Sequence, residues 1–341
     1  MVDSHIHARR HPPIRKGSTV SLFSFKTASI SASVLAAAFL LTACGGQSAT
    51  TSSDPNAGLS GAVTIDGSST VAPLSEAAAD LFRDIEPDVN VTVATSGTGG
   101  GFQSFCAGET DISDASRPIK DEEAALCDEN GIEFTQVVMA NDGLSVAVNL
   151  DNDWASCLTV DQLATAWSPE SEGEITNWNQ LDSSYPDEPL ALFGAGTDSG
   201  TFDYFTEAIN GESGAIRTDF SPSEDDNIIV QGVAGAAGGM GFFGLSYVEE
   251  NSDQIKALEI DGGDGCVAPT SDTVQDGSYS PLGRPLFIYV NNASYDEKPQ
   301  MRSFIDFYVE NEDDIAAASL FIGLTPEQKV TAQDQLATLV S

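Results

Sequence analysis

The sequence predicts an α/β fold in which helices flank a parallel or mixed β-sheet. Short apolar runs typical of strands alternate with amphipathic segments typical of helices from residue 61 to the end of the chain. Three of the strand-like runs lead directly into turns of glycine, serine and threonine that open a helix. With 341 residues, of which 41% are hydrophobic, the chain is long enough for one large domain or for two.

The three strand–turn–helix units follow the same order. Their strands are predicted at 62–65, 89–93 and 190–193, their turns at 66–71, 94–101 and 194–201, and their helices from Leu74, Phe102 and Phe202. A helix that begins in such a turn leaves backbone N–H groups without intrahelical partners, and these groups can hold a small anion. For the third turn the alternative is that Ser199 is an ordinary N-cap.

The remaining elements complete the alternation. Further strands are predicted at 137–148, 228–230 and 285–290, and further helices at 163–167, 304–309, 315–321 and from Pro326 onward. The strand at 137–148 is expected to break at Asn141-Asp142-Gly143, where the chain would cross between domains. The glycine-rich segment 235–244 is interpreted as close backbone packing and not as a site.

Residues 1–43 are expected to be a bacterial lipoprotein signal peptide. Five Lys and Arg residues precede an apolar stretch, 28–41, that is too short for a usual membrane span, and Leu41-Thr42-Ala43-Cys44 follows. This order resembles a lipobox, in which Cys44 becomes the lipidated first residue; the alternative is a secretory signal with an incidental cysteine. Residues 44–60, rich in Gly, Ser and Thr, are expected to tether the exported domain to the outer face of the membrane.

The charge of the chain excludes several classes of partner. The formal net charge is −38, with 52 acidic and 14 basic residues. Binding to nucleic acid or to an anionic lipid surface would need many more Lys and Arg residues, so we expect membrane attachment only through the lipid. The acidity is interpreted as a solvated surface.

The exported part contains no histidine. The leader holds all three His and five of the 14 basic residues, which leaves nine Lys and Arg residues after it. A Ser-His-Asp or Cys-His catalytic site and a His-ligated metal are therefore excluded. We expect no enzymatic activity, no cofactor and no metal.

Four cysteines remain after Cys44, and an oxidising compartment favours two disulfides. Three pairings are possible. Cys106 and Cys127 are close in sequence and are paired here, which leaves Cys157 with Cys266.

Arg117 is the basic residue that the sequence places best for an anion. It follows Ser116 in a turn at the end of a strand, close to other hydroxyl side chains. The arginine fork suits bidentate contact with an oxyanion. The alternative is an ordinary exposed arginine.

The turn motifs together resemble a known family. They are Asp66-Gly67-Ser68-Ser69-Thr70-Val71, Ser96-Gly97-Thr98-Gly99-Gly100-Gly101-Phe102, Asp114-Ala115-Ser116-Arg117-Pro118-Ile119 and Asp198-Ser199-Gly200-Thr201-Phe202. Over about residues 61–341 the chain is similar to the substrate-binding lipoproteins of bacterial high-affinity phosphate ABC transporters, the PstS-like family.

The resemblance implies a type II periplasmic-binding-protein fold, in which two α/β lobes are joined by two chain crossings. We place the crossings near residues 140 and 284, so that lobe one is 61–140 plus 284–341 and lobe two is 141–283. Phosphate would lie in the cleft, and the lobes would close on it by a hinge motion. The resemblance also implies a monomer that delivers phosphate to the permease subunits of a transporter.

The resemblance implies phosphate-binding donors on each turn. They are Ser69 and Thr70 on the first, Thr98 and Gly99 on the second, and Ser199, Gly200 and Thr201 on the third. In the best-known branch of the family, an Arg lies four residues before the Ser of the third turn and an Asp follows the Ser of the lobe-one turn. Ala195 and Arg117 stand at those positions here, so Arg117 is expected to supply the cation.

Selectivity for hydrogen phosphate over sulfate needs a carboxylate that accepts the ligand's proton. Asp142 is the first candidate, and Asp114 and Asp198 are weaker ones; for each the alternative is a solvated acid in a loop. Other possible functions are a carrier of another tetrahedral oxyanion such as sulfate or molybdate, a secreted phosphatase, or a surface lipoprotein for adhesion.

Overall fold

A mixed β-sheet lies at the centre of the fold. The computed structural model describes residues 58–197 and 199–339. The strand order in the main sheet is β2-β1-β3-β12-β4-β8-β6-β7, and β9 pairs with β4. These strands are β1 (Gly61–Gly67), β2 (Val89–Ala94), β3 (Ile112–Ala115), β4 (Phe134–Asn149), β6 (Ala191–Ala195), β7 (Ser221–Ser223), β8 (Gly239–Gly244), β9 (Ile255–Ala257) and β12 (Gly283–Asn291). β1 runs parallel to β2 and β3, whereas β12 runs antiparallel to β3 and β4.

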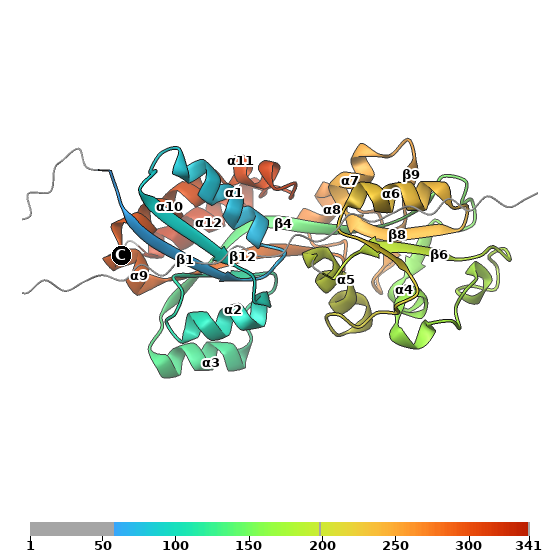
Figure 1. Cartoon of the computed structure of the whole chain (residues 1–341), viewed down its shortest axis with the longest axis horizontal. Coiled ribbons are helices and arrows are strands. Elements are labelled where there is room, and N and C mark those ends of the chain that lie inside the picture. The colour runs from blue at the N-terminus through green and yellow to red at the C-terminus, as the bar shows by residue number, and fades with distance from the viewer. Residues whose placement is uncertain (1–57, 198, 340–341) are drawn as a thin grey trace, which may run out of the picture. The chain divides into compact units, whose positions relative to one another are not determined.

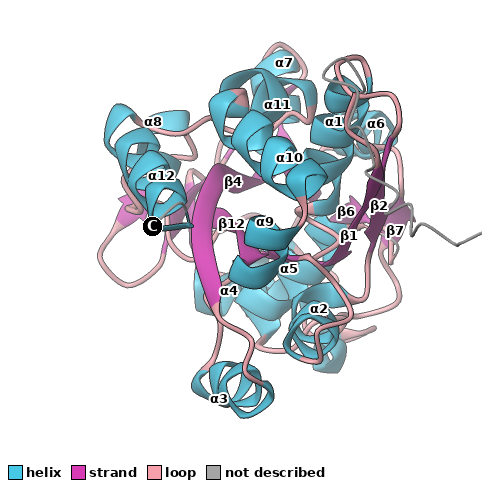
Figure 2. Ribbon diagram, turned by 90° about the vertical axis from the view of Figure 1, so that its left-hand side faces the viewer, coloured by secondary structure: helices cyan, strands magenta, loops and turns pink. Residues whose placement is uncertain are grey.

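A small second sheet joins β5 (Cys157–Thr159), β10 (Glu259–Asp261) and β11 (Cys266–Val267). The helices are α1 (Ala72–Arg83), α2 (Gly97–Cys106), α3 (Asp121–Asn130), α4 (Val160–Trp167), α5 (Gly200–Asn210), α6 (Asp226–Gly235), α7 (Leu245–Glu250), α8 (Ser271–Gln275), α9 (Asn292–Glu297), α10 (Pro299–Glu310), α11 (Glu312–Ala318) and α12 (Pro326–Leu339). They lie on both faces of the main sheet, with α1 and α10 opposite α2 and α3 (Figure 2). The predicted α/β class is confirmed.

The apolar side chains form two separate cores, one for each lobe. β4 contributes residues up to Ala140 to the first core and residues from Leu144 to the second. The second core ends at Leu282, and the first resumes at Leu286 on β12. β4 and β12 therefore connect the two lobes, and they run side by side between the two groups of helices (Figure 1). The two-lobed arrangement agrees with the predicted fold.

Three predicted details differ from the structure. β4 is continuous, because Asn141, Asp142 and Gly143 keep their pairing with β12. The run at 228–230 is helical, because Asp225 caps α6 by accepting the N–H of Asn227 at 3.0 Å. An apolar run this short fits a buried helix as well as a strand. α2 begins at Gly97, five residues before the predicted start at Phe102.

Both predicted disulfides, Cys106–Cys127 and Cys157–Cys266, are present. The leader, Cys44 and nearly all of the tether lie outside the described residues. Among the residues that are described, no helix is both long and apolar enough to cross a membrane.

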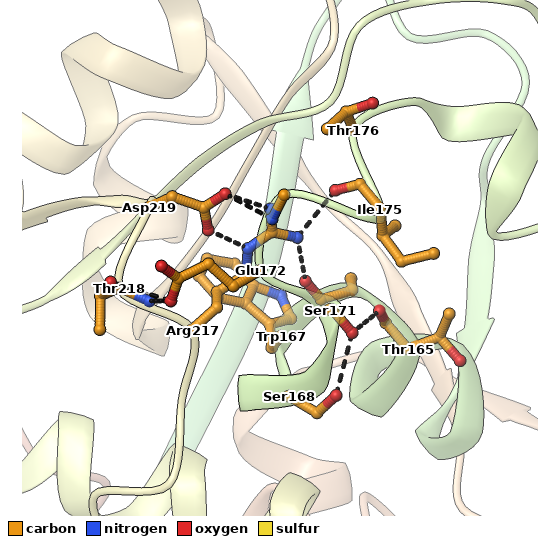
Figure 3. Close-up of polar contacts among 12 residues, drawn as sticks. Thr165, Trp167, Ser168, Ser171, Glu172, Ile175, Thr176, Arg217, Thr218 and Asp219 are labelled. Atoms are coloured by element: carbon orange, nitrogen blue, oxygen red, sulfur yellow. Dashed lines mark hydrogen bonds and ion pairs between the residues drawn. The ribbon is translucent and has the colours of Figure 1, made fainter.

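A buried arginine, Arg217, forms hydrogen bonds with several segments of lobe two (Figure 3). Arg217 is 4% exposed and donates to both carboxylate oxygens of Asp219, at 2.5 and 2.8 Å. It also donates to the carbonyl oxygens of Ala166 and Ile175, at 3.0 and 2.8 Å. The hydrogen bonds from Arg217 lower the pKa of Asp219 to about 2. All of these partners belong to lobe two, so Arg217 has a structural role.

Candidate functional site

A cavity of about 240 Å³ lies between the two lobes. Lobe one lines it with the first turn, the start of α2 and the segment after β3, and lobe two lines it with α5 and the loop that follows. The lining residues are Ser68, Ser69, Thr70, Gly97, Thr98, Gly99, Ser116, Arg117, Lys120, Asp203, Tyr204, Glu207, Ser213 and Arg284. Five of the predicted ligand-binding residues are among them: Ser69, Thr70, Thr98, Gly99 and Arg117.

The first turn is held against β3 by its backbone. Gly67 has a φ of +148°, and a Cβ there would lie 2.1 Å from the carbonyl oxygen of Asp114, so only glycine fits. The N–H of Ser68 donates to that same oxygen at 2.9 Å. This close contact fixes Ser69 and Thr70 at the cavity wall, immediately before α1.

The second turn presents the N-terminus of α2. Gly97, Thr98 and Gly99 form the first turn of this helix, where backbone N–H groups have no intrahelical acceptor. The Thr98 hydroxyl lies 3.0 Å from the Ser116 hydroxyl and accepts the Ser116 N–H at 3.2 Å. The helix therefore adds N–H donors and a positive dipole end to the cavity.

Arg117 reaches the cavity in a bidentate pair with Glu123. Its two terminal nitrogens donate to the carboxylate at 2.9 and 2.8 Å, and its side chain is 23% exposed. The hydrogen bonds to Glu123 raise the pKa of Arg117. The bonds that Glu123 accepts from Arg117 and from the Lys120 N–H outweigh burial, so the pKa of Glu123 is lowered. The guanidinium is thus a fixed cation at the cavity wall.

Arg284 is a second cation that the sequence analysis did not select. Its Nη2 donates to Thr70 Oγ1 at 3.0 Å, and its Nε donates to Asp142 Oδ2 at 3.4 Å. The guanidinium carbon lies 3.3 Å from the ring centroid of Tyr204, which is a cation–π contact. A signal was available, because Arg284 is one of only nine basic residues after the leader and lies at a predicted crossing.

Basic side chains gather at the cavity although the protein is acidic. Arg117, Lys120 and Arg284 are three of the nine basic residues after the leader, and all three line it. The other six each contact an acidic side chain or a carbonyl oxygen away from the cavity: Arg83, Arg217, Lys256, Lys298, Arg302 and Lys329. Two of the three cavity residues also pair with carboxylates beside the cavity, Arg117 with Glu123 and Arg284 with Asp142. Asp203 and Glu207 are the acidic residues that line the cavity.

The third turn stands beside the cavity and does not line it. The Ser199 hydroxyl accepts the N–H of Thr201 at 3.2 Å, which is the N-cap geometry of the alternative interpretation. The Gly200 carbonyl accepts the Thr70 hydroxyl at 3.2 Å. Thr201 lines a different hollow, of about 650 Å³. In place of these residues, α5 presents side chains from its following turns, Asp203, Tyr204 and Glu207.

Two of the carboxylates predicted to accept a ligand proton, Asp142 and Asp114, do not line the cavity. Asp142 lines the 650 Å³ hollow and pairs with Arg284; burial raises its pKa although Arg284 opposes the change. Asp114 is fully buried and accepts the Ser75 hydroxyl at 2.8 Å, and burial raises its pKa to about 8. Asp198 is outside the described residues.

Asp203 is one of two carboxylates in the cavity lining, the other being Glu207, and it is the one that bonds across the lobes. Its Oδ2 accepts the Ser69 hydroxyl from lobe one at 3.3 Å, and its Oδ1 accepts the Ser213 hydroxyl at 2.8 Å. Together with the Thr70–Gly200 bond, the Ser69–Asp203 bond joins the two lobes at the cavity. No local motif marks Asp203, because its place at the cavity depends on how the lobes meet.

Comparison with known proteins places this geometry in a family. The family model for the PBP superfamily domain matches residues 48–312. The chain is 45% identical to Protein SphX of Synechocystis over 265 residues, which are 78% of this chain and 79% of that protein. It is 36% identical to the phosphate-binding protein PstS of Staphylococcus saprophyticus over 307 residues, which are 90% and 92% of the two chains.

A solved structure shows the same fold. The crystal structure of a possible phosphate binding protein from Planctomyces limnophilus aligns with a TM-score of 0.79 and 43% identity. The alignment covers 83% of this chain and 100% of that one. The similarity therefore extends over most of the chain.

Proposed function

The chain belongs to the PBP superfamily, and on that premise we propose that it binds inorganic phosphate outside the cytoplasm and delivers it to the permease of an ABC transporter. The observation that carries the proposal is the gathering of three of the nine basic residues on one cavity of an otherwise acidic chain. The relatives named as phosphate-binding proteins support the same ligand. The protein is a carrier with no chemistry of its own.

The lining residues divide the work of holding a tetrahedral anion. Arg117 and Arg284 supply charge-assisted hydrogen bonds from lobe one and from the crossing strand. The N–H groups of Thr98 and Gly99 add donors from the start of α2. The hydroxyls of Ser69 and Thr70 donate to Asp203 and to the Gly200 carbonyl in this structure. They complete the set by rotating so that each donates to a phosphate oxygen instead.

Asp203 is the acceptor for the ligand's own proton. A carboxylate can only accept, so it forms a hydrogen bond with the P–OH of hydrogen phosphate. Sulfate has no such proton. One of its oxygens would therefore face the carboxylate without a hydrogen bond, and the two negative groups would repel each other. Asp203 therefore takes the role that the sequence had suggested for Asp142.

The remaining parts of the proposal concern location and assembly. Cys44 carries the lipid that anchors the chain, and the segment 44–60 tethers the lobes to the outer face of the membrane. The protein acts as a monomer, because one chain supplies both walls of the cavity.

The test is calorimetric titration with phosphate and with sulfate. We expect phosphate to bind much more tightly than sulfate, and we expect Asp203→Asn to reduce this preference about tenfold or more, because the lost bond is charge-assisted. Asp80→Asn is the matched control, since this carboxylate is 72% exposed, pairs with Arg83 away from the cavity lining and should leave the preference unchanged. An equal preference in Asp203→Asn and the parent protein would refute the role of Asp203, and absence of phosphate binding would refute the function.

A further inference from the structure

A second hollow, of about 280 Å³, shares part of its lining with the cavity and has a different character. Five residues line both spaces: Ser116, Arg117, Tyr204, Glu207 and Arg284. Both arginines of the proposed phosphate site therefore stand at the junction. An anion bound between them would lie next to the opening of this second hollow.

The part of the hollow beyond the junction is apolar. The residues found only there are Pro118, Ala208, Pro281, Pro285 and Phe287. Three of the five are prolines, which have no backbone N–H, and none has a side-chain donor. An oxygen of the ligand would find few partners in this space, whereas a hydrocarbon group would be removed from water.

The hollow is large enough for a ring. An apolar cavity of roughly 150 Å³ is enough to hold benzene, and this hollow has about 280 Å³. Phe287 is 7% exposed and provides a firm wall. The Tyr204 ring is fixed by its contact with Arg284 and by the bond from its hydroxyl to the Pro281 carbonyl at 2.8 Å.

We infer that the cleft also binds phosphoryl compounds that carry one small apolar substituent, with the phosphoryl group between Arg117 and Arg284 and the substituent in the hollow lined by Ala208, Pro285 and Phe287. The inference rests on the proposed function, because the phosphoryl group takes the place of inorganic phosphate. A phosphonate replaces one oxygen by carbon and keeps three oxygens for the donors of the cavity. It directs its carbon substituent to the side where donors are scarce.

The experiment titrates the full chain with inorganic phosphate, methylphosphonate and phenylphosphonate in a calorimeter. Phenylphosphonate should bind about tenfold more tightly than methylphosphonate, because the ring buries more apolar surface. Affinity that falls from methyl to phenyl, or binding of phosphate with no binding of either phosphonate, would overturn this inference and leave the proposed function intact. Failure of all three ligands would instead refute the proposed function.

Two variants locate the substituent. Ala208 lies on α5, is partly exposed and lines only the second hollow. Ala208→Phe should weaken phenylphosphonate at least tenfold and leave phosphate within about twofold, because the new ring fills the hollow. Ala208→Ser is the matched control and should change neither affinity. If Ala208→Phe does not fold, Pro285→Phe fills the same space from the exposed side of β12. Equal losses for phosphate and phenylphosphonate would contradict the placement.

Discussion

At the scale of single residues, the Arg284 side chain contacts residues of both lobes. It bonds to Thr70 in lobe one, pairs with Asp142 on β4 and stacks on Tyr204 in lobe two. Its side chain is only 13% exposed, so solvent screens these interactions weakly. A ligand that binds Arg284 therefore acts on both lobes at once.

We predict that Arg284→Ala weakens phosphate binding by about 10- to 100-fold, the range for losing hydrogen bonds to a charged group. Arg284→Lys should recover only part of the affinity, because an ammonium group lacks the planar fork. Calorimetry checks both variants. Arg83→Ala is the control, because Arg83 is 63% exposed and pairs with Asp80 far from the cavity lining. Unchanged affinity in Arg284→Ala would exclude Arg284 from the site.

At the scale of elements, the start of α5 determines how closely the lobes approach. A Cβ on Gly200 would lie 2.6 to 2.7 Å from the backbone nitrogen, Cα and Oγ1 of Thr70. Glycine is therefore needed because lobe one occupies the space of a side chain. The sequence suggested an anion seat at this turn, and the structure shows a contact between lobes.

Gly200→Ala should accordingly weaken phosphate binding about tenfold or more, because the added methyl group keeps the lobes apart. The ligand-free protein should unfold at about the same denaturant concentration, because Gly200 is the first residue of α5 and the helix-interior preference for alanine does not apply there. Gly235→Ala is the matched control, because a Cβ there meets open space near the end of α6. The same affinity in both variants would contradict the steric argument.

At the scale of the whole molecule, the two disulfides constrain chain segments of very different length. Cys157–Cys266 spans 109 residues and closes most of lobe two into one loop, whereas Cys106–Cys127 spans 21 within lobe one. The entropy that a crosslink removes from the unfolded chain grows with the logarithm of loop length. The longer loop therefore contributes more to stability.

Replacing Cys157 and Cys266 together by serine should lower the free energy of unfolding by about 5 kcal/mol. A reductant added to this variant would then break only Cys106–Cys127, with a further loss of about 3 kcal/mol. Denaturant unfolding with and without reductant measures both steps. A smaller loss for the 109-residue loop than for the 21-residue loop would show that loop entropy does not dominate.

Much of the fold and part of the candidate site follow from local sequence patterns. The alternation of apolar runs predicts the α/β class, and turns of glycine and hydroxyl residues predict which strands open helices. Such patterns involve only residues that are close in sequence, so they can be recognised before the fold is known. The position of Arg117 in its turn marked it as a candidate, and the family resemblance marked Thr70 and Thr98; all three line the cavity. The local patterns failed at 228–230, where a three-residue apolar run carries no period.

The sequence by itself determined the class of fold, the scarcity of basic residues and the hydroxyl-rich turns from which lobe one builds its wall. Only the tertiary structure decided which distant residues complete that wall. Arg284 lies 214 residues from its partner Thr70, and Asp203 lies 134 residues from Ser69. The physical reason is that the distance between two side chains on different lobes depends on how the lobes meet at β4 and β12. The number of residues between them in the sequence does not determine that distance.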